Sequence, residues 1–349
     1  MNQPTVIVVG AGVAGLACAR ELSRRGVPVR VLERARGVGG RCATRRVAGD
    51  QPVDHGVPFL HAASGEFRQA FDELDPAGKI PGWPRRVRQP KLACQPGAFN
   101  PGRRRQARRE GLSAFPKHLA RGLEVELNRT VRALRDGEGE VAVEFENGEH
   151  LAARFVVLAC AVDQSLALAA PCVADWSGAR GALEAMRAIR PIRTLTVIAG
   201  YGLDVPEPPF DIWYPIETTM LHTISHDSAK RTAPSSRVLV LQARPRYSEE
   251  YLERPAEEWR DELVWEAGEL LGAWAARPAW TQTHRWRSAR VRPAELLGES
   301  PVFESPRGGR VVVIGDAFAR DPGLEGAYMS GISVGEQVAT LPSVRESRA

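Results

Sequence analysis

Short apolar runs and a helical repeat alternate at the start of the chain. Residues 5–9 form a run rich in β-branched side chains, which predicts a buried strand, and a glycine-rich turn follows at residues 10–15. Apolar positions with helical spacing extend over residues 16–25, and a second apolar run, residues 29–33, ends in an acid. The order of strand, turn, helix and strand predicts a βαβ unit.

The middle of the chain has a different pattern. Residues 123–134 and 141–158 alternate between apolar and polar positions, which predicts antiparallel strands. Asn147-Gly148 is a strong hairpin-turn signal within the second stretch. Residues 249–274 have the spacing of a long amphipathic helix.

The end of the chain returns to the pattern of its beginning. Residues 310–316 form a buried strand that ends in Gly315-Asp316, and helical periodicity follows over residues 325–339. We therefore predict an α/β protein in which a Rossmann-type domain, built from both ends of the chain, is joined to a second, mixed α+β domain. The predicted first domain comprises residues 1–60, 111–165 and 285–349, and the second comprises residues 61–110 and 166–284.

The composition of the 349 residues is that of a globular protein. With 43% hydrophobic and 26% charged residues, the chain lies outside the disordered, collagenous and disulfide-scaffold classes. No apolar run approaches the roughly 18 residues of a membrane span, and no basic segment precedes the first apolar run as in a signal peptide. Five irregularly spaced cysteines, without a Cys-x-x-Cys pair or a zinc-like histidine cluster, predict reduced thiols and no metal site. We expect a cytoplasmic protein.

The net charge of +5 is local, because residues 85–109 carry nine basic residues and no acid. A solvated loop is the default interpretation of this stretch. Alternatively, Arg103–Arg105, or Arg108 and Arg109, border a pocket entrance and attract an anionic or dinucleotide substrate. A nucleic-acid partner is not expected, since the stretch has neither an interleaved aromatic platform nor a recognition motif.

The glycine-rich turn has the spacing of a dinucleotide-binding loop. Gly10 permits the tight turn, Gly12 lets the backbone approach a pyrophosphate, and Gly15 lets the helix pack closely on the strand. Glu33, 23 positions after Gly10, is placed to accept hydrogen bonds from ribose hydroxyls and disfavours a 2′-phosphate. The alternative is a glycine turn in an ordinary βαβ unit.

Further features favour FAD over NAD as the dinucleotide. Gly39-Gly40-Arg41 provides an arginine that can face the phosphates, and Gly56 would let the backbone pass close to a planar ring. Asp316 suits ribityl hydroxyls. A helix opened by Glu325-Gly326-Ala327 would direct its amides at the flavin edge where negative charge develops on reduction.

Together these motifs resemble those of the FAD-dependent amine oxidase superfamily, and within it the renalase-like branch is most similar. The narrower similarity rests on residues 111–119, 224–231, 284–290 and 325–331. The resemblance implies a two-domain flavoprotein that accepts a hydride from a small-molecule substrate at flavin N5, with O2 as the usual acceptor. In the renalase-like branch the substrates are misreduced dihydronicotinamide dinucleotides, and elsewhere they are amines or desaturable carbons.

The sequence departs from the renalase-like pattern at two places. Ala317 stands where an aromatic residue usually follows the Gly-Asp pair, and the segment after Gly56 reads Val-Pro-Phe-Leu-His. The C-terminal segment, where some amine oxidases tether the flavin, has no cysteine, so noncovalent FAD is expected. We hypothesise a renalase-like oxidation of a dihydronicotinamide-type substrate. The alternatives are an amine oxidase or desaturase of a specialised pathway, and a flavin-binding protein without catalysis.

The candidate site residues form two groups. His284, Trp286 and Tyr214 are candidates for the substrate pocket, although each also suits plain packing. The residues predicted to bind FAD are Gly10, Gly12, Val13, Ala14, Gly15, Glu33, Arg34, Gly40, Arg41, Gly56, Val57, Pro58, Phe59, Val131, Gly315, Asp316, Gly326 and Ala327.

Overall fold

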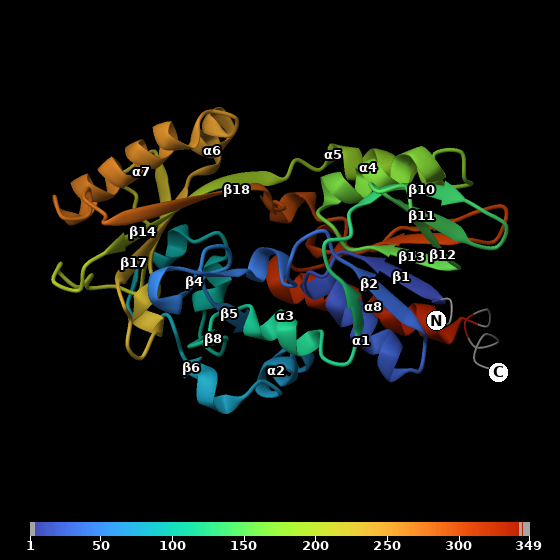
Figure 1. Cartoon of the computed structure of the whole chain (residues 1–349), viewed down its shortest axis with the longest axis horizontal. Coiled ribbons are helices and arrows are strands. Elements are labelled where there is room, and N and C mark those ends of the chain that lie inside the picture. The colour runs from blue at the N-terminus through green and yellow to red at the C-terminus, as the bar shows by residue number, and fades with distance from the viewer. Residues whose placement is uncertain (1–3, 342–343, 345–349) are drawn as a thin grey trace. The chain divides into compact units, whose positions relative to one another are not determined.

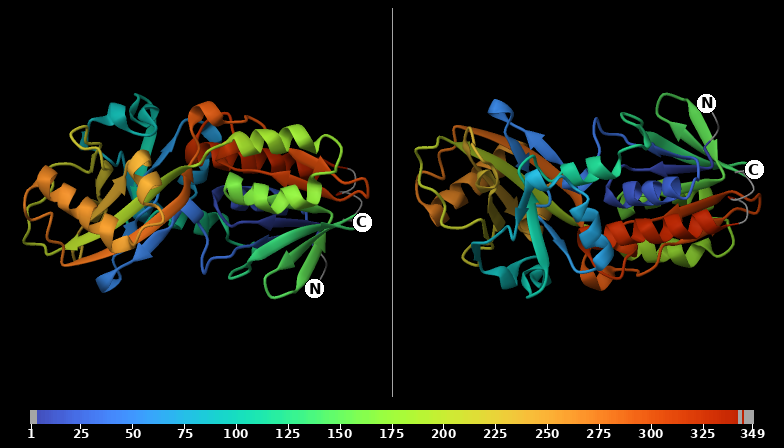
Figure 2. Two further views of the ribbon diagram at one scale, coloured as in Figure 1. Left: turned by 90° about the horizontal axis from the view of Figure 1, so that it is seen from above. Right: turned by 90° about the horizontal axis from the view of Figure 1, so that it is seen from below.

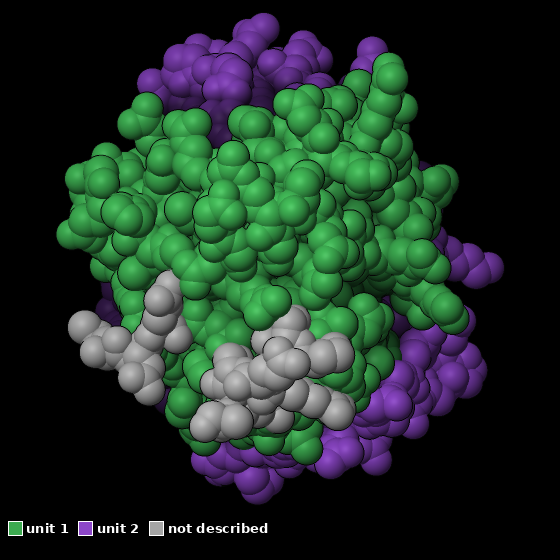
Figure 3. All heavy atoms as spheres, turned by 90° about the vertical axis from the view of Figure 1, so that its right-hand side faces the viewer, with its two compact units in different colours: residues 1–40, 115–191, 290–349 green, residues 41–114, 192–289 purple. Residues whose placement is uncertain are grey.

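The computed structural model describes residues 4–341 and residue 344, and the chain in it forms two compact units. Unit 1 contains residues 1–40, 115–191 and 290–349, and unit 2 contains residues 41–114 and 192–289 (Figure 3). Each unit therefore combines segments that are distant in the sequence.

Unit 1 is built on a six-stranded sheet (Figure 1). Five strands are parallel and the edge strand β19 is antiparallel to its neighbour β20. In sheet order the strands are β19 (Val302–Glu304), β20 (Arg310–Val313), β13 (Phe155–Leu158), β1 (Val6–Val9), β2 (Val29–Leu32) and β9 (Glu124–Glu126). The central strands β1 and β13 are buried along their whole length, as expected of strands covered on both faces.

Helices cover both faces of this sheet (Figure 2). On one face, α1 (Val13–Arg24) lies against α8 (Gly323–Thr340), which joins the beginning of the chain to its end. A Cβ atom on Gly331 of α8 would lie 2.2 Å from the carbonyl oxygen of Ala14, so a glycine is needed for this close approach of the two helices. The short helix α3 (Ala114–Leu119) begins where the chain passes from unit 2 to unit 1.

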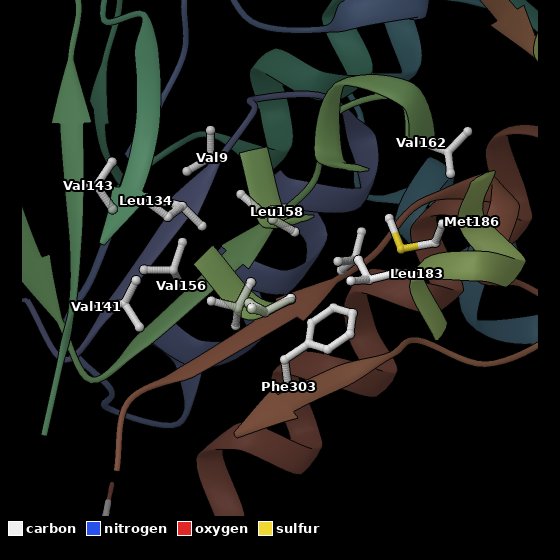
Figure 4. Packing of buried hydrophobic residues seen from close by; sticks show 14 of the residues in the cluster. Val9, Leu134, Val141, Val143, Val156, Leu158, Val162, Leu183, Met186 and Phe303 are labelled. Atoms are coloured by element: carbon white, nitrogen blue, oxygen red, sulfur yellow. The ribbon is translucent and has the colours of Figure 1, made fainter. Parts of the chain in front are cut away.

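The other face carries two helices and a small sheet. These elements are α4 (Val162–Val173), α5 (Ala179–Ala188), and the antiparallel strands β10 (Val131–Asp136), β11 (Val141–Phe145) and β12 (His150–Ala153). Their apolar side chains pack with those of the main sheet into one core, which contains Val156 and Leu158 of β13 together with Leu183 and Met186 of α5 (Figure 4). The hairpin predicted at Asn147-Gly148 is confirmed as the turn between β11 and β12.

Unit 2 is built on a second six-stranded sheet, in which β15 is antiparallel to β16 and parallel to β7. In sheet order its strands are β18 (Trp280–Arg290), β14 (Ile192–Tyr201), β17 (Arg237–Ala243), β16 (Leu221–His226), β15 (Ile212–Trp213) and β7 (Val87–Arg88). Two small sheets and one helix complete the unit: β3 (Thr44–Arg46) with β4 (Pro52–Asp54), β5 (Leu60–Ala62) with β8 (Arg104–Arg108) and β6 (Lys79–Pro81), and α2 (Gly65–Asp72).

The long helix predicted over residues 249–274 is wrong in its length. The segment forms two helices, α6 (Pro245–Tyr251) and α7 (Ala256–Leu271), whose apolar side chains pack on the sheet of unit 2. Pro255 caps the start of α7, and because proline has no amide hydrogen and clashes with the preceding turn, it separates the two helices.

The boundaries of the two units differ from the predicted domain boundaries. Residues 41–60, 111–114 and 285–289 belong to unit 2, and residues 166–191 belong to unit 1. The physical reason lies in packing that the sequence pattern does not show. Strand β4 packs on the sheet of unit 2, where Gln51 donates a hydrogen bond to the Ser236 carbonyl, and α4 and α5 complete the core of unit 1.

The helices within residues 4–341 are all too short or too polar to cross a lipid bilayer.

Candidate cofactor and substrate sites

The glycine turn after β1 has the geometry of a dinucleotide-binding loop. Gly10 adopts a φ of +108°, and its amide donates a 2.8 Å hydrogen bond to the Leu32 carbonyl of the adjacent strand. A Cβ atom on Gly15 would lie 2.0 Å from the Gly10 carbonyl oxygen, so only glycine permits this contact. A Cβ atom on Gly12 would meet nothing within 4 Å, which leaves that side of the loop open to a ligand.

The start of α1 can bind an anion. The first intrahelical bond runs from the Leu16 amide to the Gly12 carbonyl, so the amides of Val13 and Ala14 precede it. The first turn contains no acidic residue that would offset the positive end of the helix dipole. Gly40 lies beside this turn, because a Cβ atom on Gly40 would lie 3.6 Å from the Cα of Gly12.

Glu33 is held at the end of β2 by two backbone amides. Its Oε2 accepts a 2.7 Å hydrogen bond from the Ala11 amide, and its Oε1 accepts a 2.9 Å bond from the Ala35 amide. A carboxylate has about four acceptor positions, so both oxygens can still accept from ribose hydroxyls. The structure thus places the predicted ribose ligand directly beside the glycine turn, whereas the neighbouring Arg34 is exposed.

The second predicted cofactor segment follows β20, and its Gly315 lies near Cys160, as Gly10 does. Gly315, with a φ of +142°, follows β20 and donates its amide to Ser330 Oγ at 3.0 Å, and Asp316 is nearly buried. Helix α8 begins at Gly323, two residues before the predicted start, so the amides at its positive end are those of Gly323 and its successors. A Cβ atom on Gly326 would lie 1.9 Å from the Asp321 carbonyl, which makes Gly326 a packing glycine.

Two further residues that were predicted to bind FAD, Ala327 and Val131, pack within unit 1. Ala327 is buried in α8, where its carbonyl accepts a 3.1 Å hydrogen bond from Ser330. Val131 begins β10 and packs against the core of unit 1.

In unit 2, Gly56 lies close to a planar ring, which is the indole of Trp286. A Cβ atom on Gly56 would lie 3.0 Å from Trp286 Cζ2 and 2.3 Å from the Arg41 carbonyl. The same carbonyl accepts the Val57 amide at 3.1 Å. Trp286 Nε1 donates a 3.2 Å hydrogen bond to the His55 carbonyl, so the indole is fixed over this segment.

His284 and Trp286, predicted together as pocket residues, are in contact, and His55 joins them. The ring centroids of His284 and Trp286 are 4.2 Å apart, and that of His55 lies 5.0 Å from His284 and 5.3 Å from Trp286. Arg45 Nη2 lies 3.3 Å from His284 Nδ1. His55 Nδ1 is buried without a hydrogen-bond partner among the described residues.

Both imidazoles of this cluster are neutral at neutral pH. Burial, together with the nearby Arg45 guanidinium, lowers the pKa of His55 to about 3 and that of His284 to about 4. The cluster can therefore accept or donate hydrogen bonds without adding charge. The sequence reasoning missed His55 and Arg45 as members. The available signal for His55 was its place in the Asp54-His55-Gly56 motif.

A buried ionic network, which the sequence reasoning also missed, supports the His55 segment. Lys230 Nζ lies 2.6 Å from Asp54 Oδ2 and 2.5 Å from Asp227 Oδ1, and all three side chains are completely buried. Arg231 bonds to both carboxylates and is only 4% exposed. Two cations thus balance two anions. Although burial opposes ionisation, the Lys230 and Arg231 charges hold the pKa of Asp54 below its usual value.

Tyr214, the third predicted pocket residue, belongs to a separate aromatic cluster in unit 2. Its side chain is buried, and its ring centroid lies 6.1 Å from that of Phe99. Phe59, predicted to bind FAD, packs in the same cluster, 5.7 Å from Phe99 and 6.2 Å from Trp83. Val57 and Pro58, which connect Gly56 to Phe59 along the chain, are half-buried.

Three arginines of the basic stretch pair with acids of unit 2. Arg86 bonds to Asp211 at 3.1 Å, and Arg104 bonds to Asp72 at 3.0 Å. Arg108 is buried and paired with an acid at the end of β8. The stretch contributes strands β7 and β8, and most of its basic side chains are exposed to solvent.

Two family models match the chain. A model described as flavin-containing amine oxidoreductase matches residues 85–339, and one described as an NAD(P)-binding Rossmann-like domain matches residues 8–74. The first match covers most of the chain and the second covers the glycine turn and Glu33.

Curated relatives match over short segments. A Mycobacterium tuberculosis protein named as a flavin-containing monoamine oxidase, AofH, is 58% identical over 55 residues, which are 16% of this chain and 12% of that protein. Phytoene desaturase of Neurospora crassa is 40% identical over 70 residues, 20% of this chain and 12% of that one. The match thus spans about an eighth of the length of these relatives.

Solved structures match over almost the whole chain. A double mutant of putrescine oxidase aligns with a TM-score of 0.72 at 15% identity, covering 97% of this chain and 99% of that one. Cyclohexylamine oxidase from Brevibacterium oxydans aligns with a TM-score of 0.71 at 15% identity, with the same coverage. The predicted two-domain α/β fold is confirmed by these matches.

Proposed function

Because the chain belongs to the family of flavin-containing amine oxidoreductases, we propose that it is an FAD-dependent amine oxidase that accepts a hydride from a small amine. Membership confirms the predicted superfamily and the flavin cofactor, whereas the narrower renalase-like assignment stays a prediction. The relatives described above are named amine oxidases and a desaturase, which supports the amine oxidase alternative over the renalase-like reading.

The observation that carries the proposal is the cradle at the start of α1. Its open face at Gly12, its unopposed helix dipole and its firmly held Glu33 carboxylate suit the pyrophosphate and ribose of FAD. In this proposal Val13 and Ala14 donate their amides to phosphate, and Arg41 faces the phosphates from the second loop. The last cysteine is Cys172, which supports noncovalent binding.

The end of the chain would hold the remainder of the cofactor. We assign Asp316 to the ribityl hydroxyls and the start of α8 to the flavin edge. When bound, FAD supplies the electron-pair acceptor at N5. The positive end of α8 would stabilise the negative charge that develops at the N1/C2=O edge of a reduced flavin, and this requires no side-chain acid.

The substrate side of the proposal rests on unit 2. The aromatic cluster around Tyr214 suits an apolar amine, and the neutral imidazoles of His55 and His284 suit hydrogen bonding without charge repulsion of an ammonium group. The arginines of residues 85–109 that pair with acids are less available to an anionic dinucleotide, which disfavours that substrate class.

The renalase-like reading keeps one specific observation in its favour. Two of the four segments on which it rests, residues 224–231 and 284–290, contact consecutive residues of the chain: Lys230 pairs with Asp54, and Trp286 donates a hydrogen bond to the His55 carbonyl. A built site at this place would serve either substrate class. We therefore retain oxidation of a dihydronicotinamide-type substrate as the second candidate.

Anaerobic stopped-flow reduction of the purified holoprotein separates these functions. We expect primary amines or polyamines to bleach the flavin on a time scale between the instrument dead time and seconds. Admission of air should then restore the flavin colour and release hydrogen peroxide. Bleaching by dihydronicotinamides alone would favour the second candidate. A flavin that no substrate reduces would support a flavin-binding protein without catalysis. Restoration by an artificial acceptor but not by air would refute O2 as acceptor.

We also propose that the protein works in a reducing compartment such as the cytoplasm. None of the five cysteines, all of which lie within the described residues, forms a disulfide, which supports this proposal.

A further inference from the structure

A cysteine and a histidine that the proposed function does not use meet in unit 2. Cys94 Sγ lies 2.8 Å from His222 Nε2, although 128 positions separate the two residues in the sequence. Cys94 is exposed and lies between two short 3-10 turns, and His222 is half-buried as the second residue of β16. The pair is therefore made by the tertiary structure and can be reached from solvent.

The contact has the geometry of an activated thiol. The thiolate is the nucleophilic form of cysteine, and an imidazole within hydrogen-bond distance can take the thiol proton and stabilise the anion that results. At 2.8 Å the imidazole nitrogen and the sulfur can share one proton directly.

Two titratable groups near the pair are Tyr214 and His61. Tyr214 lies with its ring centroid 6.0 Å from that of His222, and burial raises the pKa of this phenol far above neutrality, so it stays uncharged. Beside Cys94, Gln95 Oε1 pairs with His61 Nε2 at 2.8 Å.

The other four cysteines are buried or half-buried. Burial raises the pKa of Cys18, Cys42 and Cys160 to about 12, and that of Cys172 to about 11. These thiols stay protonated at neutral pH and provide internal references for reactivity.

We propose that Cys94 and His222 form a reactive thiol site at which hydrogen peroxide oxidises cysteine to sulfenic acid. The thiolate sulfur attacks one peroxide oxygen, the O–O bond breaks, and the departing hydroxide takes the proton of the His222 imidazolium to leave as water. Sulfur loses two electrons and peroxide gains them. An internal source of peroxide rests on the proposed oxidase function, but the reactivity of the site does not.

Oxidation would add a polar oxygen beside the aromatic cluster of Tyr214. Because Tyr214 is a predicted wall of the substrate pocket, we expect the sulfenic acid to lower amine turnover by raising KM. The site would then link accumulation of the product peroxide to slower substrate use.

The first experiment measures alkylation of the intact holoprotein by iodoacetamide, with each cysteine quantified by peptide mass spectrometry. At pH 7 we expect Cys94 to react at least tenfold faster than Cys172. From pH 6 to 9 the Cys94 rate should be nearly flat. An unpaired thiol would instead gain almost tenfold per pH unit below its ordinary pKa of about 8.5. Such a rise in the wild-type protein would overturn the proposal without any variant.

The second experiment compares His222→Asn with the control His150→Asn, which alters an exposed histidine on β12. Each unit by which the imidazole lowers the thiol pKa raises the thiolate fraction below that pKa about tenfold. The same unit lowers the intrinsic reactivity of the thiolate about threefold. We therefore expect His222→Asn to slow alkylation at pH 6.5 threefold or more, and to match or exceed the wild-type rate above pH 9. Parallel profiles would assign His222 a merely structural role and refute the activation.

The third experiment adds hydrogen peroxide and traps sulfenic acid with dimedone. We expect dimedone on Cys94 of the wild-type protein and of His150→Asn, and at least threefold less on His222→Asn. No adduct on Cys94 would refute the oxidation. Because the peroxide is supplied from outside, this result is independent of whether amines reduce the flavin.

Discussion

Replacing Lys230 by methionine should strongly destabilise unit 2. Methionine keeps most of the side-chain volume but removes the ammonium that contacts Asp54 and Asp227 at 2.6 and 2.5 Å. The network then holds two buried carboxylates and only the Arg231 guanidinium. One negative charge is left uncompensated where the side chains of both acids are fully buried.

The expected cost follows from breaking a buried ion pair on one side. Such changes destabilise by about 3–5 kcal/mol, because the remaining charge keeps its desolvation cost without its partner. For a domain of this size, about 2–4 °C of melting temperature corresponds to each kcal/mol, so a decrease of roughly 6–20 °C is expected. The control Lys79→Met, which removes a partly exposed pair with Asp72, should cost at most about 1 kcal/mol.

The dependence on pH and a second substitution test the cause. In the wild-type protein the pKa of Asp54 is lowered, so its contribution to stability is present above its unfolded pKa of about 3.9 and is lost below it. In Lys230→Met the uncompensated carboxylates protonate more readily, so the deficit should shrink as pH falls from 7 toward 5. Adding Asp227→Asn restores charge balance and should recover part of the stability.

Thermal and urea unfolding, followed by tryptophan fluorescence at several pH values, would measure these effects. A Lys230→Met protein within about 1 kcal/mol of the wild type would show that the network does not carry the expected energy. A double variant less stable than Lys230→Met alone would refute the charge-balance explanation.

Three further predictions concern the cofactor loop, the helix pair and the buried histidine. Glu33→Ala should weaken FAD binding about ten- to a hundredfold through lost charged hydrogen bonds, while exposed Glu138→Ala retains it, as flavin absorbance after gel filtration would show; full occupancy in Glu33→Ala would contradict the ribose role. Gly331→Ala should cost about 1–3 kcal/mol in urea unfolding because its Cβ meets a carbonyl, whereas Gly181→Ala, which meets nothing, should be neutral or stabilising; equal effects would refute the close-packing argument. The pKa of His55 is lowered to about 3, so the unfolded chain binds more protons below pH 6.5 and stability should fall from there toward pH 3; a His55→Gln profile as steep as the wild type would exclude His55 as the source.

Local chemistry explains why the cofactor loop was predictable. Gly10, Gly12, Gly15 and Glu33 lie within one βαβ unit, where the turn, the helix start and the distal acid follow from spacing along the chain. The same holds for the hairpin at Asn147-Gly148, since its short loop, with Gly148 at a φ of +84°, depends on local backbone preferences.

Long-range packing explains what the pattern did not reveal. Asp54 and Lys230 are 176 positions apart, and neither carries a signal that it will be buried with an opposite charge. The same applies to His55 with Trp286 and to Cys94 with His222. The apolar spacing also predicted one helix across Pro255, because apolar positions on the two sides of a helix break can keep the same helical phase.

The amino-acid sequence alone predicts the strands, the turns and the dinucleotide loop of this chain, because each of them depends on residues close together in the sequence. Only the tertiary structure decides which charges are buried together, which rings meet and where one unit ends. Those outcomes depend on burial and on distances between remote segments, which set the free energy of ionic and aromatic contacts and have no period along the chain.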